Sequence, residues 1–170
     1  METQQAQAPV LKLSWREKFA GLLVLLIGIV YLLWQMTDFI SSKSGAYAVK
    51  EGALQVSTSE LFNHIRSIIS ILLAFIGGWL LLKGKRAGWV IGISLLFLLN
   101  VIAAGIMIAS YAAVDNLNKM VGGALVLPLL LALIFLLLPS ARLKYKVGRN
   151  TLVTTVALIV LLIGLYFFLQ

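Results

Sequence analysis

Residues 88–111 read GWVIGISLLFLLNVIAAGIMIASY, and this stretch decides the fold class. It contains no Asp, Glu, Lys, Arg or His, and it is continuously apolar rather than alternating. A helix needs about 20 mostly apolar residues to cross a hydrocarbon core about 30 Å thick. The stretch meets that length, and its continuous pattern disfavours a membrane-spanning strand. We therefore predict a transmembrane helix here.

Four further stretches have the same character and also lack internal charge: residues 19–36, 67–82, 121–138 and 152–169. The predicted fold is all-α, a polytopic transmembrane helix bundle with about five membrane-spanning helices in a single domain, 1–170. Composition agrees, because 61% of the residues are hydrophobic, 12% are charged and the mean hydropathy is +1.03. A soluble domain is about a quarter charged. The chain has no cysteine, which excludes disulfides and thiolate metal sites.

The basic residues predict the orientation. Ten of them fall in the three segments on the N-terminal side of the predicted bundle: Lys12, Arg16, Lys18, Lys83, Lys85, Arg86, Arg142, Lys144, Lys146 and Arg149. The other side holds four (Lys43, Lys50, Arg66 and Lys119), which its four acids balance. An excess of Lys and Arg marks the cytoplasmic face. We expect the N-terminus inside, the C-terminus outside, and anionic lipid head groups against the inner turns.

Aromatic residues and local signals mark the expected helix ends. Rings with a polar edge favour the head-group zone. They are expected at the inner interface (Trp15, Trp79, Trp89, Tyr145) and at the outer one (Trp34, Tyr111, Tyr166). Ser14 with Glu17, and Ser57 with Glu60, form the capping-box spacing, and Pro139 is expected to stop the fourth helix. Residues 38–64 are the longest connection, expected as a loop on the outer leaflet or as a docking surface.

Asn100 is the sharpest chemical feature, because it lies near the middle of the third segment, where an amide in lipid is costly. It is expected to make an interhelical polar contact, or to contact a ligand. Small residues let neighbouring helices approach closely. On that ground Gly77, Gly78, Gly88 and Gly92 are predicted as helix-packing positions, and the third helix is predicted at the centre of the bundle.

Two other features suggest a role. Pro128 lies inside the fourth segment, where it removes one backbone hydrogen bond and is either a static kink or a hinge. Glu60 and His64 form an i, i+4 pair at the outer start of the second helix, a solvated helix-end pair or an outer-face polar site. A metal site needs three or four ligands. We therefore predict no metal, no cofactor and no catalytic residue.

These features favour a non-catalytic structural or interaction subunit of a membrane complex, packed against another membrane protein or a second copy. The alternative is a small permease or channel-like transporter that uses Asn100 and the kinked fourth helix. A lipid-acting membrane enzyme at Glu60 and His64 is the third possibility. A basic groove with aromatic platforms is absent from the sequence, so no nucleic acid is expected. Compact loops favour a plasma membrane, specifically a bacterial inner membrane.

Overall fold

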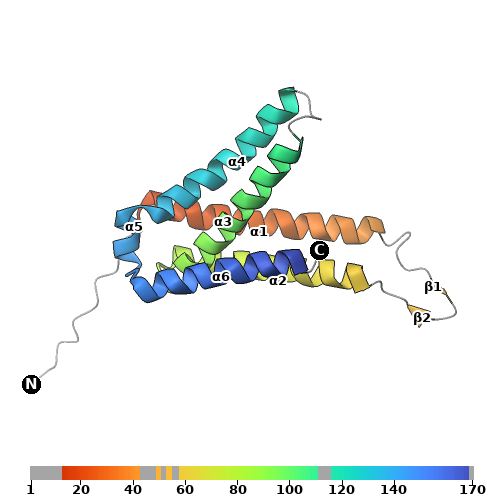
Figure 1. The fold of residues 1–170 in the computed structure, drawn as a ribbon, viewed down its shortest axis with the longest axis horizontal. Helices are drawn as coiled ribbons and strands as arrows, with labels where there is room; N and C mark the ends of the chain where they lie inside the picture. The colour runs from red at the N-terminus through yellow and green to blue at the C-terminus, as the bar shows by residue number, and fades with distance from the viewer. Residues whose placement is uncertain (1–12, 43–48, 51–52, 55–57, 111–115, 169–170) are drawn as a thin grey trace, which may run out of the picture.

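The computed structural model of the chain describes residues 13–42, 49–50, 53–54, 58–110 and 116–168. These residues form six helices: α1 (Trp15–Ser42), α2 (Thr58–Leu82), α3 (Arg86–Ser110), α4 (Asn116–Leu137), α5 (Pro139–Lys144) and α6 (Arg149–Phe168). Figure 1 shows that α1, α2 and α6 run along the long axis of the molecule. The fold is helical, as predicted.

Helix occupies both ends of the expected loop 38–64, because α1 continues to Ser42 and α2 already begins at Thr58. Between them, β1 (Val49–Lys50) and β2 (Ala53–Leu54) form a small antiparallel hairpin in which Val49 pairs with Leu54. The apolar pattern marks the part of a helix that suits hydrocarbon, whereas helical hydrogen bonds continue into polar sequence. The sequence reading had not anticipated this hairpin.

Within the part of the chain that the structure describes, four helices are long and apolar enough to cross a membrane, over Trp15–Asp38, His64–Leu82, Arg86–Ile108 and Arg149–Tyr166. This fits a membrane-embedded protein. In the part of α4 whose side chains are described, the apolar segment is shorter, Val126–Leu137. The described residues thus hold four candidate spans, and the predicted number of five stays a prediction.

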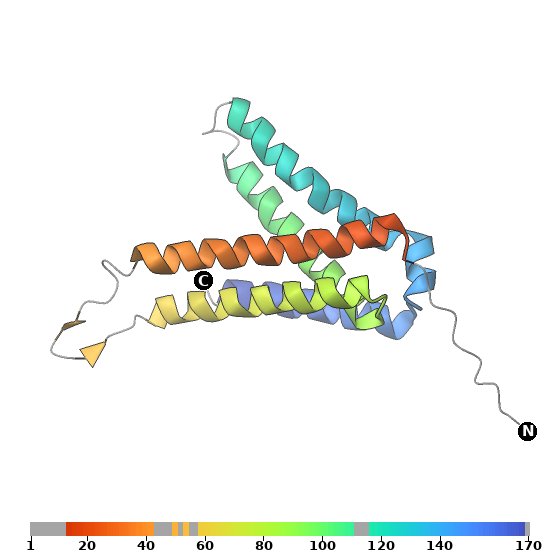
Figure 2. The same cartoon turned by 180° about the vertical axis from the view of Figure 1, so that it is seen from behind.

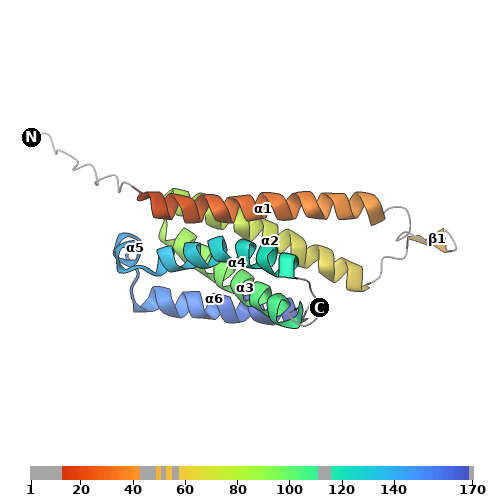
Figure 3. The same ribbon diagram turned by 90° about the horizontal axis from the view of Figure 1, so that it is seen from above.

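Helix α3 packs against α1, α2, α4 and α6, which gives it the central position that its small residues predicted. Helix α4 packs against α1 and α3. In Figures 1 and 2 the α3–α4 hairpin leaves the other helices at an angle, so that its tip lies away from α1, α2 and α6. Figure 3 shows α1 and α6 on opposite sides of the molecule. The α3–α4 hairpin therefore joins the other helices at one end of the bundle and diverges from them towards the other, whereas α1, α2 and α6 stay side by side.

The three basic segments meet at the joined end, called the basic end below. Lys144 Nζ at the end of α5 lies 2.6 Å from Glu17 Oε2 in the first turn of α1. Glu17 Oε2 also accepts the backbone N–H of Ser14 at 2.9 Å, which is the carboxylate half of the predicted capping box. The Tyr145 hydroxyl donates to the Leu81 carbonyl at 3.2 Å. These contacts bind α1, the last turn of α2 and the end of α5 together.

The ion pair at this end is largely buried, since the side chains of Lys144 and Glu17 are 15% and 5% exposed. Removing one partner of such a pair typically costs about 3–5 kcal/mol, because the other charge stays buried. Burial, with a smaller contribution from the negative charge of Glu17, raises the pKa of Tyr145 well above its ordinary value. The phenol therefore keeps its proton and remains a donor to Leu81.

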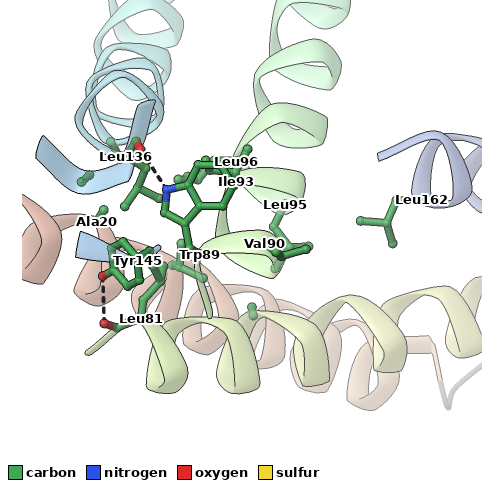
Figure 4. Close-up of a cluster of buried hydrophobic side chains, with 14 residues drawn as sticks. Ala20, Leu81, Trp89, Val90, Ile93, Leu95, Leu96, Leu136, Tyr145 and Leu162 are labelled. Atoms are coloured by element: carbon green, nitrogen blue, oxygen red, sulfur yellow. Dashed lines mark hydrogen bonds between the residues drawn. The ribbon is translucent and has the colours of Figure 1, made fainter. Parts of the chain in front are cut away.

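Two aromatic residues expected in the inner belt lie inside the protein instead. Trp89 is 1% exposed and Tyr145 is 2% exposed. Trp89 Nε1–H donates to the Leu136 carbonyl at 2.9 Å, which satisfies the indole without water (Figure 4). An aromatic ring with a polar edge suits a buried site with one acceptor as well as it suits a head-group zone. Other belt residues are exposed (Trp15, Trp34, Trp79), Tyr166 is half-buried, and Tyr111 lies outside the described residues.

Pro139 ends α4, as its sequence position predicted, and it then starts α5 as the first helical residue. Proline suits that position because its missing N–H would have no intrahelical acceptor there. The short helix α5 crosses the basic end, and it places Lys144 beside Glu17 and Tyr145 beside the Leu81 carbonyl.

Glycines permit the closest helix contacts. A Cβ at Gly88 would collide with backbone atoms of Leu80 and Leu81, far inside any normal contact distance. A Cβ at Gly92 would lie 2.5 Å from a methyl carbon of Leu81. Both glycines lie on α3, so they set how closely α3 approaches α2.

The glycine pair of α2 faces two different helices. A Cβ at Gly77 would lie 2.7 Å from Ile91 of α3. A Cβ at Gly78 would lie 2.6 Å from Leu25 and 3.0 Å from the Gly21 carbonyl of α1. Adjacent residues on a helix point about 100° apart, so the pair lets α2 pack tightly against α1 and α3 at once.

We predict that Gly88→Ala lowers stability by about 1–3 kcal/mol, the usual range for overpacking, because backbone of α2 blocks the added methyl. Gly105→Ala in the same helix is the matched control, because nothing lies within 4 Å of its Cβ position. The control should leave stability unchanged or raise it by up to about 1 kcal/mol, the helix-propensity gain. Thermal unfolding of both variants in one detergent measures this. Equal midpoints would contradict the packing described.

Candidate functional site

A cavity of about 500 Å³ lies between α1, α2, α3 and α6. This is within the range of about 300–1,000 Å³ that is usual for small-molecule pockets. Its walls are mainly aliphatic, with side chains contributed by α1 and α3: Val24, Ile27, Leu95, Leu98, Leu99 and Ile102. Small residues, Gly28 and Ala74, complete the wall where α1 meets α2.

The cavity is elongated along the helices. Its lining on α1 extends from Val24 to Trp34, and ten residues of helix rise about 15 Å. That is about half of a hydrocarbon core of about 30 Å. On α2 the lining extends from Ala74 up to Arg66, near the end of the bundle where α1 ends and α2 begins (Figure 1). We call this end the loop end.

Polar groups of the lining gather towards the loop end. The Arg66 guanidinium carbon lies 5.0 Å from the centre of the Tyr166 ring, a cation–π geometry that joins α2 to α6. Ser70 Oγ donates to the Arg66 carbonyl at 2.8 Å. The Tyr31 hydroxyl and Ser67 Oγ, 3.2 Å apart, connect α1 to α2 beside them. Among the described lining residues, Arg66 carries the formal charge.

Asn100 does not line this cavity. Its Nδ2 donates to the Leu96 carbonyl of its own helix at 2.7 Å. Its Oδ1 is buried and has no hydrogen-bond partner among the described residues. The structure thus describes an intrahelical bond at Asn100, where the sequence had suggested an interhelical contact. The amide can make that bond locally because the carbonyl four residues earlier is always within its reach.

Pro128 lies inside α4, which continues through it from Asn116 to Leu137. Its ring supplies no N–H to the carbonyl four residues earlier. It is half-buried and is not part of the cavity lining. Asn100 and Pro128 therefore do not share the cavity that the described residues form.

His64 lies at the loop end, where its Nδ1 is 3.1 Å from Gln35 Nε2 of α1. Because Gln35 Nε2 is a donor, Nδ1 accepts in this arrangement. Glu60 lies on α2, but its side chain is outside the described residues, so the predicted Glu60–His64 site cannot be placed. Within the described ranges, no three His, Cys, Asp or Glu side chains gather as a metal site would require.

Sequence reasoning missed the cavity, because it depends on how far α3 diverges from α1. One signal was present. Arg66 stands directly before the predicted apolar segment 67–82, and the observed candidate span His64–Leu82 includes it. Ionisable residues within such spans are rare and mark functional positions by default.

Comparison with protein-family models, curated proteins and solved structures found no match to this chain.

We predict that Asn100→Leu leaves stability unchanged or raises it by about 1–2 kcal/mol. The substitution removes a buried oxygen that lacks a partner, and such groups cost about 1–3 kcal/mol. The Leu96 carbonyl keeps its backbone donor four residues later in the helix. Thermal unfolding in detergent provides the measurement, and Ser94→Leu is the comparison, because Ser94 is fully buried and donates to Val90. A large loss of stability in Asn100→Leu would mean that Oδ1 does have a partner.

Proposed function

We propose that this chain is a non-catalytic integral membrane protein that serves as an interaction subunit, packing against another membrane protein or a second copy. Two glycines within the candidate spans support the proposal. Nothing lies within 4 Å of the Cβ position at Gly105 of α3 or at Gly164 of α6. In contrast, Gly77, Gly78, Gly88 and Gly92 each hold a neighbouring helix at short range. Lipid supplies no hydrophobic effect that would drive helices together, so helices associate through close packing, which small residues permit.

The environment of Gly105 strengthens this reading. It lies on the splayed part of α3, and its neighbours Ala104 and Ile108 are exposed, Ile108 to 78%. Gly164 is likewise exposed on α6, one and two turns beyond exposed Leu161 and Ala157. Glycine costs about 1 kcal/mol relative to alanine in a helix. A helix of a partner that packed on these positions would offset that cost.

The polar side chains of the spans favour a non-catalytic role. Ser70, Ser94, Thr154 and Thr155 each donate to a carbonyl four residues earlier in their own helix. Such bonds satisfy a hydroxyl locally and leave it poorly placed for chemistry. The permease alternative has less support, because Asn100 and Pro128 lie off the cavity. The lipid-acting enzyme has less support as well, because His64 is engaged by Gln35.

For the orientation, we propose five spans with the basic end at the cytoplasmic face of a plasma membrane, specifically a bacterial inner membrane. Lys83, Lys85 and Arg86 of the α2–α3 turn lie at this end together with Arg142 and Lys144. Positive charge is retained on the cytoplasmic side during insertion. Anionic lipid head groups at that face add about 1 kcal/mol for each nearby cation.

Single-cysteine labelling tests the orientation cleanly, because the natural chain has no cysteine. Lys85→Cys marks the α2–α3 turn, and Phe168→Cys marks the opposite end of α6, where the native side chain is 85% exposed. In intact cells a membrane-impermeant maleimide should label position 168 and spare position 85 until the membrane is opened. The cysteine-free parent is the control. Labelling of position 85 from outside would reverse the proposed topology.

Substitution of the two open glycines tests the interaction role. We expect Gly105→Leu and Gly164→Leu to keep the unfolding midpoint of the wild type, because both positions are open. The same variants should reduce the co-purified partner, or the dimer on native gels, by about tenfold or more, the effect of losing about 1.4 kcal/mol of packing. Val153→Leu, on an exposed position of α6, is the control. Wild-type protein that runs as a monomer without any partner would refute the proposal.

A further inference from the structure

We propose that the cavity between α1, α2, α3 and α6 binds an anionic phospholipid, with one acyl chain inside it and the phosphate at Arg66. The proposal concerns a lipid site at the loop end and is independent of whether the chain has a protein partner. Its basis is the combination of an elongated aliphatic cavity and a cation at one end of that cavity.

The elongated shape of the cavity suits a single extended chain. The cavity has about 500 Å³ along about 15 Å of helix, and a flexible hydrocarbon chain can lie along it parallel to the helices. The aliphatic walls from Leu95, Leu98 and Ile102 suit such a chain.

The depth of the cavity matches one leaflet. Its lining covers about 15 Å of α1, half of the hydrocarbon thickness, and it ends near Arg66, close to the start of the candidate span His64–Leu82. A chain inside the cavity would therefore lie parallel to the chains of the surrounding leaflet. Its head group would reach the level of Arg66 without leaving the interface.

The chemistry at the loop end selects an anionic phosphate. A guanidinium carries five N–H donors in a planar fork that matches phosphate oxygens, and one face remains able to stack. Here Tyr166 stacks with the guanidinium at 5.0 Å, which holds Arg66 on the wall of the cavity. The Ser70 hydroxyl donates to the backbone carbonyl of Arg66, and Tyr31 of α1 also lines the cavity. A zwitterionic head group brings its own cation towards Arg66 and should bind less well.

Native mass spectrometry of the full-length protein in mild detergent tests this, with phosphatidylglycerol and phosphatidylcholine of identical chains as probes. Wild type should retain phosphatidylglycerol in preference to phosphatidylcholine. Arg66→Gln should weaken phosphatidylglycerol binding about fivefold, the effect of one cation near an anionic head group. Arg66→Lys, which keeps the positive charge at the same position, should retain more phosphatidylglycerol than Arg66→Gln and is the matched control. Equal retention of the two lipids by wild type would overturn the proposal.

Filling the cavity separates this site from general lipid coating. Ile102→Trp places an indole in the cavity and should lower phosphatidylglycerol binding at least about tenfold, whereas Val101→Trp, on the neighbouring exposed face of α3, should not. Leu98→Trp is a second filling variant in case the first does not fold. Retention of the lipid by a folded filling variant would overturn the cavity as the site. Displacement of phosphatidylglycerol by equimolar palmitate would overturn a phospholipid as the occupant.

A fluorescence measurement gives an independent readout. Trp34 lines the cavity, so one equivalent of phosphatidylglycerol with brominated chains should quench part of the tryptophan emission in detergent. That part should disappear in Trp34→Phe and persist in Trp79→Phe, which removes an exposed tryptophan of α2. Equal quenching in wild type and Trp34→Phe would place the lipid elsewhere.

Discussion

The contact between the backbones of α2 and α3 at Gly88 is the constraint on which the rest of the structure depends. Any side chain at this position would collide with Leu80 and Leu81, so only glycine permits the approach. The approach brings Trp89 under the end of α4, where its N–H reaches the Leu136 carbonyl. Beside it, the Leu81 carbonyl in the last turn of α2 accepts both the Gly84 N–H and the Tyr145 hydroxyl. The close approach at Gly88 and these two hydrogen bonds together join α2, α3, α4 and the α5–α6 connection at the basic end.

The same end carries the buried charge pair, and together these contacts explain the shape of the molecule. Glu17 and Lys144 link the first turn of α1 to α5, next to the hydrogen bond from Tyr145. At the loop end, α1, α2 and α6 are linked as well, by the Tyr31–Ser67 and Gln35–His64 contacts and by Arg66 against Tyr166. The α3–α4 hairpin does diverge (Figure 2), and a cavity opens between α3 and α1 towards the loop end. The basic end organises the fold, and the exposed helix faces and the cavity provide the surfaces with functional potential.

Those surfaces suit two different occupants for physical reasons. Gly105 and Gly164 present smooth, open helix faces, which suit contact with another helix. The cavity is lined with aliphatic groups and ends at a guanidinium, which suits an anionic lipid. A protein that binds both would position a specific lipid beside its partner. The lipid would then add to the stability of the complex only where that lipid is present, since a ligand stabilises the state that binds it.

The sequence by itself determined the helical class, the apolar segments, the basic segments and the glycines at close contacts, because each is a property of a single helix or its ends. It also predicted the stop at Pro139 and the Glu17 cap. Tertiary structure alone decided that Trp89 and Tyr145 are buried, that Asn100 bonds to its own helix, and that Arg66 stands at the end of a cavity. The physical reason is that periodicity fixes which face a residue occupies on its own helix. What lies opposite that face depends on crossing angles, which only the packing of all the helices sets.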